Sequence, residues 1–469
     1  MSPRIEPLEA RIAPASLIDP RTVTFTDADG DDVKIVFSRN VFLGTDTAML
    51  AKANEVFKFS AGDVAHDTTT HQQLQLIDLT RLSPLVRAGV GMTITATAKD
   101  GGNGFADIGA IKAAGVSLST IAIDGDVGQI DAGGSGLKFG IKSLVVNSLG
   151  VRGIATQIPV PVPTAENPAP DLVSTITGEL TSLKVLGDIK DARLRVVDGR
   201  DTGGNITTAA KLGIVTIGGS LIGGIAAEVA SDDTGVIECD RGIGAIKIGS
   251  LPTDGIVGGG GSNSGRITSG GAIASLTITG SIAGGAGASS GFVSSFGNLG
   301  AVNIGNDLAG GAGEDSGFLR GFGAISSLTI GDDILAGTGA GSGSVRTLGA
   351  ITKLLVKGDI DARIANAGPD SASLFSNGLP LATVNGSIFG GAGAGSGVIA
   401  SGRDVGAVTL ATLTTPTFIT GITLLGSVNG GAGDGSGAIL ADGSVKLAKI
   451  KGSLIGDQGR ESGVLRLAG

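Results

Sequence analysis

Two groups of aspartates have the residue type and the spacing to bind a hard cation such as calcium. In the first, Asp27, Asp29 and Asp31 stand at alternate positions of an Asp-rich turn that also contains Gly30. Calcium prefers several carboxylate oxygens on a tight loop of this kind, although the bidentate glutamate that commonly completes such a loop is absent. We hold calcium binding here as a hypothesis. The alternative is a solvated Asp-Gly turn, which forms without any ion.

The second acidic group depends on a repeat. Asp307, Asp333 and Asp359 recur at intervals of 26 residues. If this interval is one structural unit, the three carboxylates stack at about the strand spacing of 4.8 Å and repel one another. A bridging calcium ion, partial compensation by Lys357, or screening of an exposed row by water and salt would each relieve the repulsion.

The same interval relates many other positions. Four sets of residues follow it: Ile282, Leu308, Ile334 and Ile360; Ser264, Ser290, Ser316 and Ser342; Ile273, Leu299, Ile325 and Ile351; and Leu276, Val302, Leu328 and Leu354. No long stretch within the repeat is free of glycine, and an interior glycine costs a helix about 1 kcal/mol. Three short strand-like segments with Gly, Asn and Asp corners therefore predict one coil of a parallel β-helix per period.

We predict an all-β protein, a parallel β-helix of about twelve coils with a small N-terminal β-rich domain or cap. Outside the regular stretch, interior anchors are expected at Val127, Leu149, Ile189, Leu221, Leu251, Ile388, Val428 and Leu454. Because equivalent residues stack coil on coil, Phe292 should lie over Phe318 and Phe296 over Phe322. We expect these aromatic stacks in the core.

Composition divides the chain into three parts. Residues 1–19 are a targeting-like or disordered segment, residues 20–104 a β-rich domain or cap, and residues 105–469 the β-helix. A solenoid needs a cap because its first strand edges are otherwise unpaired. Loop insertions are expected near residues 151–172, which are rich in proline, and near residues 411–421. Protruding loops of this kind are common places for partner contacts.

The overall composition argues against two classes of structure or partner. The 469 residues carry a formal net charge of −9 and include no Trp or Tyr, whereas nucleic-acid binding uses a basic surface and aromatic platforms. We therefore expect no nucleic-acid partner. No apolar run is long enough for a transmembrane helix, so no transmembrane segment is expected. The single cysteine, Cys239, excludes an intrachain disulfide framework and is expected in the core.

The first residues resemble a known targeting segment. Leu8, Glu9 and Arg11 match the LEPR-XLL-type segment of large bacterial surface or exported repeat proteins, within the run Ile5-Glu6-Pro7-Leu8-Glu9-Ala10-Arg11-Ile12-Ala13-Pro14-Ala15. Ala10 replaces the proline of that segment, and Ala13-Pro14 stands where it has two leucines. The resemblance implies a bacterial extracellular or cell-surface location and no particular activity.

Two further motifs partly match metal-binding patterns. The repeated corner GGAGxxSG resembles the calcium-binding GGxGxD nonapeptide of RTX proteins, but only Asp315 comes near the acidic position, and structural corners suffice to explain it. The second motif is the histidine-containing group Asp63, His66, Asp67 and His71. It suggests a loop zinc site, yet the spacing of the histidines puts them on no common face of a helix or strand. A solvated loop is the alternative.

The sequence thus predicts a non-catalytic, exported or cell-surface β-solenoid that acts as a structural stalk or adhesion module. Its expected partners are cell-envelope polysaccharide or surface proteins, and calcium is the one cofactor considered. A polysaccharide-cleaving β-helix enzyme is an alternative, with acids drawn from Asp188, Asp191, Asp332, Asp333 and Asp361. Against it, the repeats contain no histidine or nucleophile-base pair. A calcium-stabilised extracellular matrix protein is the other alternative.

Overall fold

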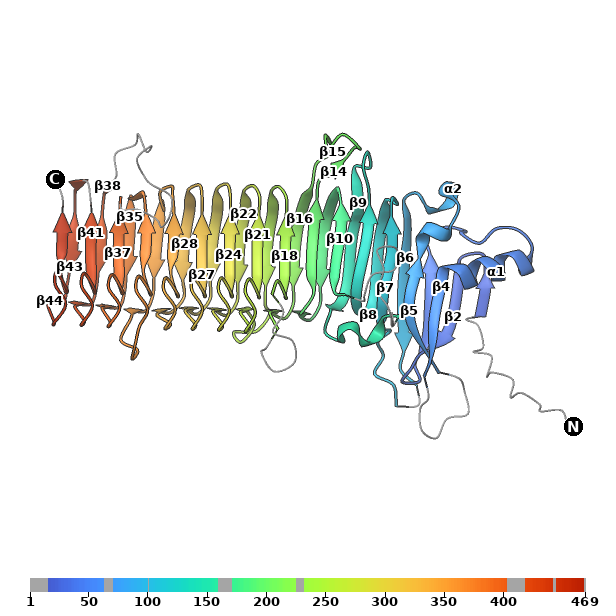
Figure 1. Ribbon diagram of the computed structural model, residues 1–469, viewed down its shortest axis with the longest axis horizontal. Helices are drawn as coiled ribbons and strands as arrows, with labels where there is room; N and C mark the ends of the chain where they lie inside the picture. Colours follow the sequence, from blue (N-terminus) through green and yellow to red (C-terminus); the bar gives the residue numbers. More distant parts are fainter. Residues whose placement is uncertain are drawn as a thin grey trace, which may run out of the picture.

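The chain forms an elongated rod in which strands of successive coils stack side by side along the long axis (Figure 1). The computed structural model describes residues 16–62, 71–99, 101–158, 171–224, 232–402, 418–441 and 444–467. Strand pairing along the rod is parallel from coil to coil. The predicted all-β parallel β-helix is therefore confirmed.

Each regular coil contributes one strand to each of three parallel sheets, which we call sheets I, II and III. Sheet I contains β9 (Phe139–Leu149), β11 (Glu179–Val185), β16 (Lys211–Ile217), β19 (Ile243–Ile248), β22 (Ile273–Ile278), β25 (Leu299–Ile304), β28 (Ile325–Ile330), β31 (Lys353–Val356), β35 (Leu381–Val384), β39 (Ile422–Leu424) and β43 (Ala448–Ile450). Sheet II contains β12 (Ile189–Lys190), β17 (Leu221–Ile222), β20 (Ile256–Val257), β23 (Ile282–Ala283), β26 (Leu308–Ala309), β29 (Ile334–Leu335), β32 (Ile360–Asp361), β36 (Ile388–Phe389), β40 (Val428–Asn429) and β44 (Leu454–Ile455). Sheet III contains β10 (Val173–Thr177), β13 (Arg193–Val197), β18 (Val236–Cys239), β21 (Arg266–Ser269), β24 (Phe292–Ser295), β27 (Phe318–Gly321), β30 (Val345–Thr347), β33 (Leu374–Ser376), β37 (Val398–Ser401), β41 (Ala438–Ala441) and β45 (Leu465–Leu467).

The coil register follows the 26-residue interval. In sheet II, Ile282 pairs with Leu308, and Leu308 pairs with Ile334. Seven of the predicted irregular anchors pair in the same column: Val127, Leu149, Ile189, Leu221, Ile388, Val428 and Leu454. All of these except Leu454, which is 50% exposed, are buried. Full burial of an Ile or Leu side chain stabilises the fold by roughly 1.5–3 kcal/mol, so the column is a main source of rod stability.

The predicted anchor at Leu251 is wrong. Ile256 pairs with both Leu221 and Ile282 and is fully buried, whereas Leu251 is 58% exposed. The cause is a local turn, in which the Asp254 carboxylate accepts the backbone N–H of Leu251 at 2.7 Å. An aspartate side chain that bonds nearby backbone N–H groups favours a turn over a strand, so the strand begins later.

The aromatic stacks form as predicted, but only one of them is buried. Phe292 and Phe318 lie with ring centroids 5.3 Å apart and planes 6° apart, and both are buried. Phe296 and Phe322 also stack, at 4.6 Å and 8°. Phe296 nevertheless is 57% exposed, so the prediction of a core location is wrong for it. It follows the end of β24, at a position that points outward from the coil.

Antiparallel strands close the N-terminal end. β1 (Ser16–Asp19), β2 (Thr22–Thr26), β3 (Asp32–Phe37) and β6 (Val90–Thr97) pair in that order, and β4 (Phe57–Gly62) pairs with β5 (His71–Asp78). β5 and β6 then pair in parallel with β7 (Ile108–Ala114) and β8 (Leu118–Gly133), so the N-terminal strands continue into the coils. Short helical segments complete the described chain: α1 (Asp46–Val56), η1 (Leu79–Arg81), α2 (Pro84–Arg87) and η2 (Gly153–Thr156). None of these described helices has the length and apolarity needed to cross a bilayer.

Several predicted features fall on residues that the structure does not describe. They are the LEPR-XLL-type segment, three members of the histidine cluster (Asp63, His66 and Asp67) and most of both predicted loop insertions. At the end of the second insertion, β38 (Phe418–Ile419) pairs with β34 (Gly378–Leu379) and β42 (Ser444–Val445) in a small parallel sheet. A hairpin of β14 (Gly199–Arg200) and β15 (Ile206–Thr208) is a further insertion, which the sequence did not predict.

The GGAGxxSG corner folds into a compact loop between sheets II and III. We call it the serine lobe: residues 284–291 and their counterparts in the other coils. The buried Ser290 hydroxyl accepts the N–H of Gly285 at 2.9 Å and donates to the carbonyl of Gly287 at 2.7 Å. Gly291 closes the lobe with a φ of +60°, and a Cβ there would lie 2.1 Å from the Ala283 carbonyl oxygen. Serine and glycine are thus required by geometry, which explains why the motif recurs.

The lobe serines predict a clear effect of mutation. Ser342→Ala leaves the Gly337 N–H without the acceptor that it has at 3.0 Å, in a buried site. An unsatisfied buried donor costs about 1–3 kcal/mol, and urea unfolding followed by circular dichroism should show a loss of that size. The exposed Ser326 of the same coil supplies the control, because Ser326→Ala should change the unfolding free energy by less than about 0.5 kcal/mol. Equal effects of the two substitutions would contradict the assigned role.

Candidate functional site

The first acidic group is a hairpin turn, residues 27–31, which we call the acidic turn. It joins β2 to β3, and its centre is organised by one carboxylate. Asp27 Oδ1 accepts the backbone N–H groups of Asp29, Gly30 and Asp31 at 3.3, 3.2 and 2.9 Å. This is the pattern by which an aspartate stabilises a turn, so the local sequence accounts for the backbone of the site.

The remaining carboxylates of the acidic turn face the segment that follows β6. Asp31 accepts the N–H of Gly104 at 2.5 Å and that of Lys99 at 3.2 Å, and it is fully buried. Asp29 accepts the N–H of Asn103 at 3.3 Å. The site therefore depends on residues more than 70 positions away, which local spacing could not reveal.

Burial changes the pKa of one carboxyl group in the acidic turn. It raises the pKa of Asp27 from 3.8 to about 8, assisted by a side-chain hydrogen bond with Asp29, while the Asp31 N–H acts in the opposite direction. One carboxylate oxygen from each of Asp27, Asp29 and Asp31 lies within 4.8 Å of the other two. Three oxygens at that spacing suit a hard cation, which would take the place of the proton.

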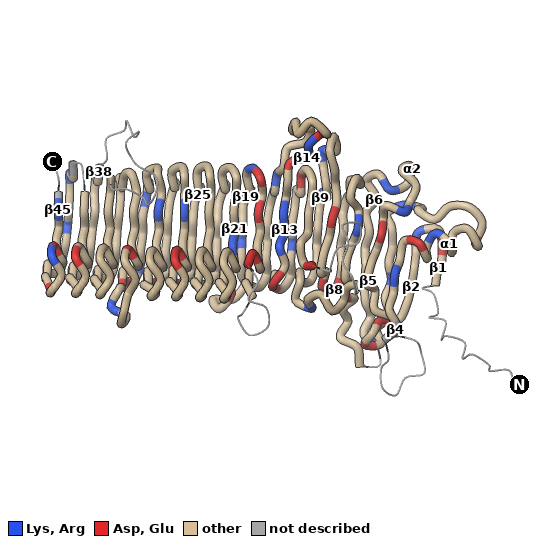
Figure 2. The backbone as a smooth tube through the Cα atoms, viewed as in Figure 1, with Lys and Arg blue, Asp and Glu red and all other residues tan. Residues whose placement is uncertain are grey.

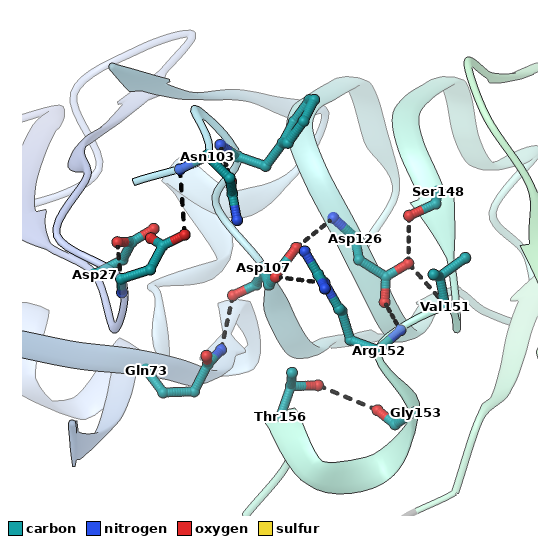
Figure 3. A network of polar contacts seen from close by, with 12 residues as sticks. Asp27, Gln73, Asn103, Asp107, Asp126, Ser148, Val151, Arg152, Gly153 and Thr156 are labelled. Carbon is teal, nitrogen blue, oxygen red and sulfur yellow. Dashed lines mark hydrogen bonds and ion pairs between the residues drawn. The ribbon is translucent and has the colours of Figure 1, made fainter. Parts of the chain in front are cut away.

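A network of hydrogen bonds and an ion pair connects residues at the start of the solenoid (Figure 3). Asp126 accepts the Ser148 hydroxyl at 2.6 Å and the Arg152 N–H at 3.0 Å. Asp107 accepts the Asp126 N–H at 3.0 Å and forms an ion pair with Arg152 at 3.0 Å. Burial raises the pKa of Asp107, against the effect of these partners. The network holds the turn before η2 and was missed because it precedes the regular repeat.

The aspartates of the second group stack in register. Asp307 Oδ1 accepts the N–H of Asp333 at 3.1 Å, and Asp333 Oδ1 accepts that of Asp359 at 2.6 Å. Asp359 Oδ1 in turn accepts the N–H of Ser387 at 2.7 Å, and Ser387 Oγ accepts that of Ser427 at 3.1 Å. Either side chain thus supplies one acceptor to the next coil, which explains why both aspartate and serine occur at this position.

The structure changes the membership of the possible metal group in this row. The oxygens of Asp307, Asp332 and Asp333 lie within 4.8 Å of one another, so Asp332 takes the place expected for Asp359. Burial raises the pKa of Asp333. The compensating cation is Arg363, whose pKa is raised by Asp361 first and by Asp359 and Asp333 as well. Within the described chain the predicted Lys357 forms no ion pair.

The acids considered for a glycosidase do not all lie together. Asp188 Oδ1 accepts the Ser220 N–H at 2.7 Å and occupies the same corner position as Asp333. Five coils separate these two residues, a distance of about 24 Å at the strand spacing, whereas paired glycosidase carboxylates are about 5–9.5 Å apart. Asp361 is held by Arg363 at 2.6 Å, and Asp191 lies at a corner with a φ of +60°.

Asp315, the acidic residue of the RTX-like corner, interacts with another side chain of the protein. It takes the left-handed position of a serine lobe, with a φ of +49°. Arg346 lies 3.6 Å from it, and burial raises the pKa of Asp315 against the effect of that arginine. The corner is accounted for by lobe geometry and one ion pair.

A groove of about 530 Å³ crosses several lobes near the C-terminal end of the rod. It is lined by Pro369, Asp370, Ala394, Gly395, Asp434, Gly435, Arg460 and Glu461. Gly395 and Gly435 occupy the positive-φ lobe position at which Asp370 and Glu461 carry side chains, so the glycines open the groove. Acidic residues recur along this edge of the rod (Figure 2). The lining suits a cationic or hydroxyl-rich ligand. The replacement of aspartate by glycine at one lobe position is the sequence feature that could have indicated the groove.

The acidic turn predicts a pH dependence. Because the pKa of Asp27 is raised on folding, the native state binds more protons than the unfolded state between about pH 4 and pH 8. The stability contributed by this group is present at low pH and is lost as the pH rises through about 8. Asp27→Asn keeps an acceptor oxygen and removes the titration.

Melting temperatures measured from pH 5 to pH 9 check this prediction. That of the wild type should fall by a few degrees relative to Asp27→Asn as the pH rises. Asp124→Asn, at an exposed position, should run parallel to the wild type. Parallel curves for wild type and Asp27→Asn would show that the carboxyl is not perturbed.

Comparisons with known proteins supply no relative: no family model, no curated protein and no solved structure matches the chain.

Proposed function

We propose that the chain is a non-catalytic, exported or cell-surface bacterial protein whose β-solenoid serves as a structural stalk or adhesion module. The observation that carries the proposal is the continuous coil register of sheets I, II and III. Such a rod holds its two ends apart and offers long exposed faces. Its recurring polar side chains are used within the protein. Lobe serines bond the glycine backbone of their own coil, and the corner aspartates and serines accept N–H groups of the next coil.

The N-terminal sequence supports the location. Leu8, Glu9 and Arg11 match a segment found on exported and surface repeat proteins of bacteria. A rod with an acidic surface, a formal net charge of −9 in all, is suited to remain soluble outside a cell. Cell-envelope polysaccharide and surface proteins are the partners that such a location offers.

Protease shaving of intact source cells tests the location. Peptides from residues 105–469 should appear in the supernatant without a cytosolic marker protein. Recovery of the protein only after lysis, with none in shaved material or culture medium, would contradict the proposal and favour an internal scaffold.

A calcium-stabilised matrix protein is the second candidate, and the acidic turn favours it. Its three carboxylates converge within 4.8 Å, and two of them, Asp27 and Asp31, are buried. A ligand that binds only the native state raises its stability by mass action. Calcium would compete with the proton at Asp27, so its effect should be larger at high pH.

Thermal melts with calcium test this candidate. Millimolar calcium should raise the melting temperature of the wild type by several degrees at pH 8, with a smaller rise at pH 5, and chelator should reverse it. Asp27→Asn should respond less. An unchanged wild-type melt at pH 8 would rule the candidate out.

A further inference from the structure

Two stacked aromatic rings follow the ends of β24 and β27 of sheet III: the exposed Phe296 and the half-buried Phe322, which together we call the aromatic platform. The rings stack at 4.6 Å with planes 8° apart, and Phe296 is 57% exposed. Exposed apolar area costs roughly 25 cal/mol per Å² relative to burial. Coil stacking explains why the rings lie over each other, but it gives no reason for an aromatic ring in solvent.

One face of the Phe296 ring is open. Phe322 covers the face toward the next coil. On the other side lies Gly270, because Ser269 pairs with Ser295 and its carbonyl accepts the Phe296 N–H at 2.9 Å. A Cβ at Gly270 would lie 2.0 Å from the carbonyl oxygen of Asp240. The backbone therefore keeps the space over that ring face clear of a side chain from the preceding coil.

Polar groups flank the platform on both sides. The Arg320 guanidinium lies 4.8 Å from the Phe322 ring centroid, and no described residue accepts a hydrogen bond from it. Asp240 is exposed. It lies one coil before Gly270, at the coil position equivalent to that of Phe296 and Phe322. One of its carboxylate oxygens accepts the Asp198 N–H at 2.9 Å, and the other accepts no hydrogen bond from the described part of the chain.

We propose that the aromatic platform binds a pyranose unit of a polysaccharide, with the C–H face of the sugar ring on the open face of Phe296. Two coil rises, about 9.6 Å, separate Asp240 from Phe296, which is room for one ring and a hydroxyl directed at the carboxylate. Arg320 donates to hydroxyl or carboxylate oxygens of a neighbouring sugar unit. The inference gives the adhesion module a ligand and rests on the proposed function.

A sugar chain suits the platform better than an acidic peptide does. The open ring face is flat, and the space beside it is about one ring thick. Groups of both charges flank it, so they can bond the many hydroxyls of a sugar. A polyanionic peptide would gain from Arg320 but would be repelled by Asp240, and it would leave the open face of Phe296 without a matching flat partner.

Binding by the purified full chain tests the assignment. The probes are dextran, a neutral pyranose polymer, and polygalacturonate, an acidic one, measured by affinity electrophoresis. The wild type should bind at least one of them, and Phe296→Ala should weaken that binding about tenfold through loss of ring stacking. Phe296→Leu, which keeps an apolar side chain but removes the flat ring, should weaken it similarly. Arg320→Gln should weaken binding of polygalacturonate more than binding of dextran.

The control is Leu381→Ala, which truncates a 51% exposed apolar side chain on sheet I and should bind like the wild type. Failure of the wild type to bind either polymer would overturn the proposal, as would unchanged binding by Phe296→Ala. Poly-glutamate binding with the same dependence on Phe296 would reassign the platform to peptides. Because the assay uses purified protein, its outcome is independent of the shaving experiment, so failure of the ligand and failure of the location are distinguishable.

Discussion

Backbone hydrogen bonds between successive coils are the interaction on which the whole molecule depends. They place each residue over its counterpart at the strand spacing of about 4.8 Å, as when Ile282, Leu308 and Ile334 pair in sheet II. Every side chain therefore meets the same kind of environment above and below. A residue type is acceptable at a coil position only if it packs against copies of itself or leaves room for them.

This constraint explains how polar groups enter a rod with an apolar interior. The corner aspartates would repel one another in register, yet each accepts an N–H group from the next coil, and Arg363 supplies positive charge nearby. Serine performs the same task at Ser387 without charge. In the serine lobes a hydroxyl both accepts and donates, so a backbone path rich in glycine is fixed without a regular strand.

The sequence predicted the repeating parts of the structure well, because one period specifies the next. It predicted poorly where local chemistry interrupts the period: Asp254 forms a turn that shifts the anchor from Leu251 to Ile256. The aspartates of the acidic turn were found from their spacing, but the burial of Asp31 depends on a distant backbone N–H. Phe296 was predicted in the correct stack but in the core, whereas its side chain is exposed. Periodicity predicts which residues pair between coils, but not whether a side chain points inward or outward.

Oxidative cross-linking of engineered cysteines tests the coil register most directly. Thr277 and Asn303 pair in adjacent coils, and Thr329 pairs with Asn303 one coil further on. The double variant Thr277→Cys with Asn303→Cys should form a disulfide, because adjacent strands fall within the Cα separation that a disulfide spans. Thr277→Cys with Thr329→Cys should not, because two coil rises of about 9.6 Å exceed that reach. Efficient cross-linking of the second pair, or none of the first, would contradict the stacked-coil account.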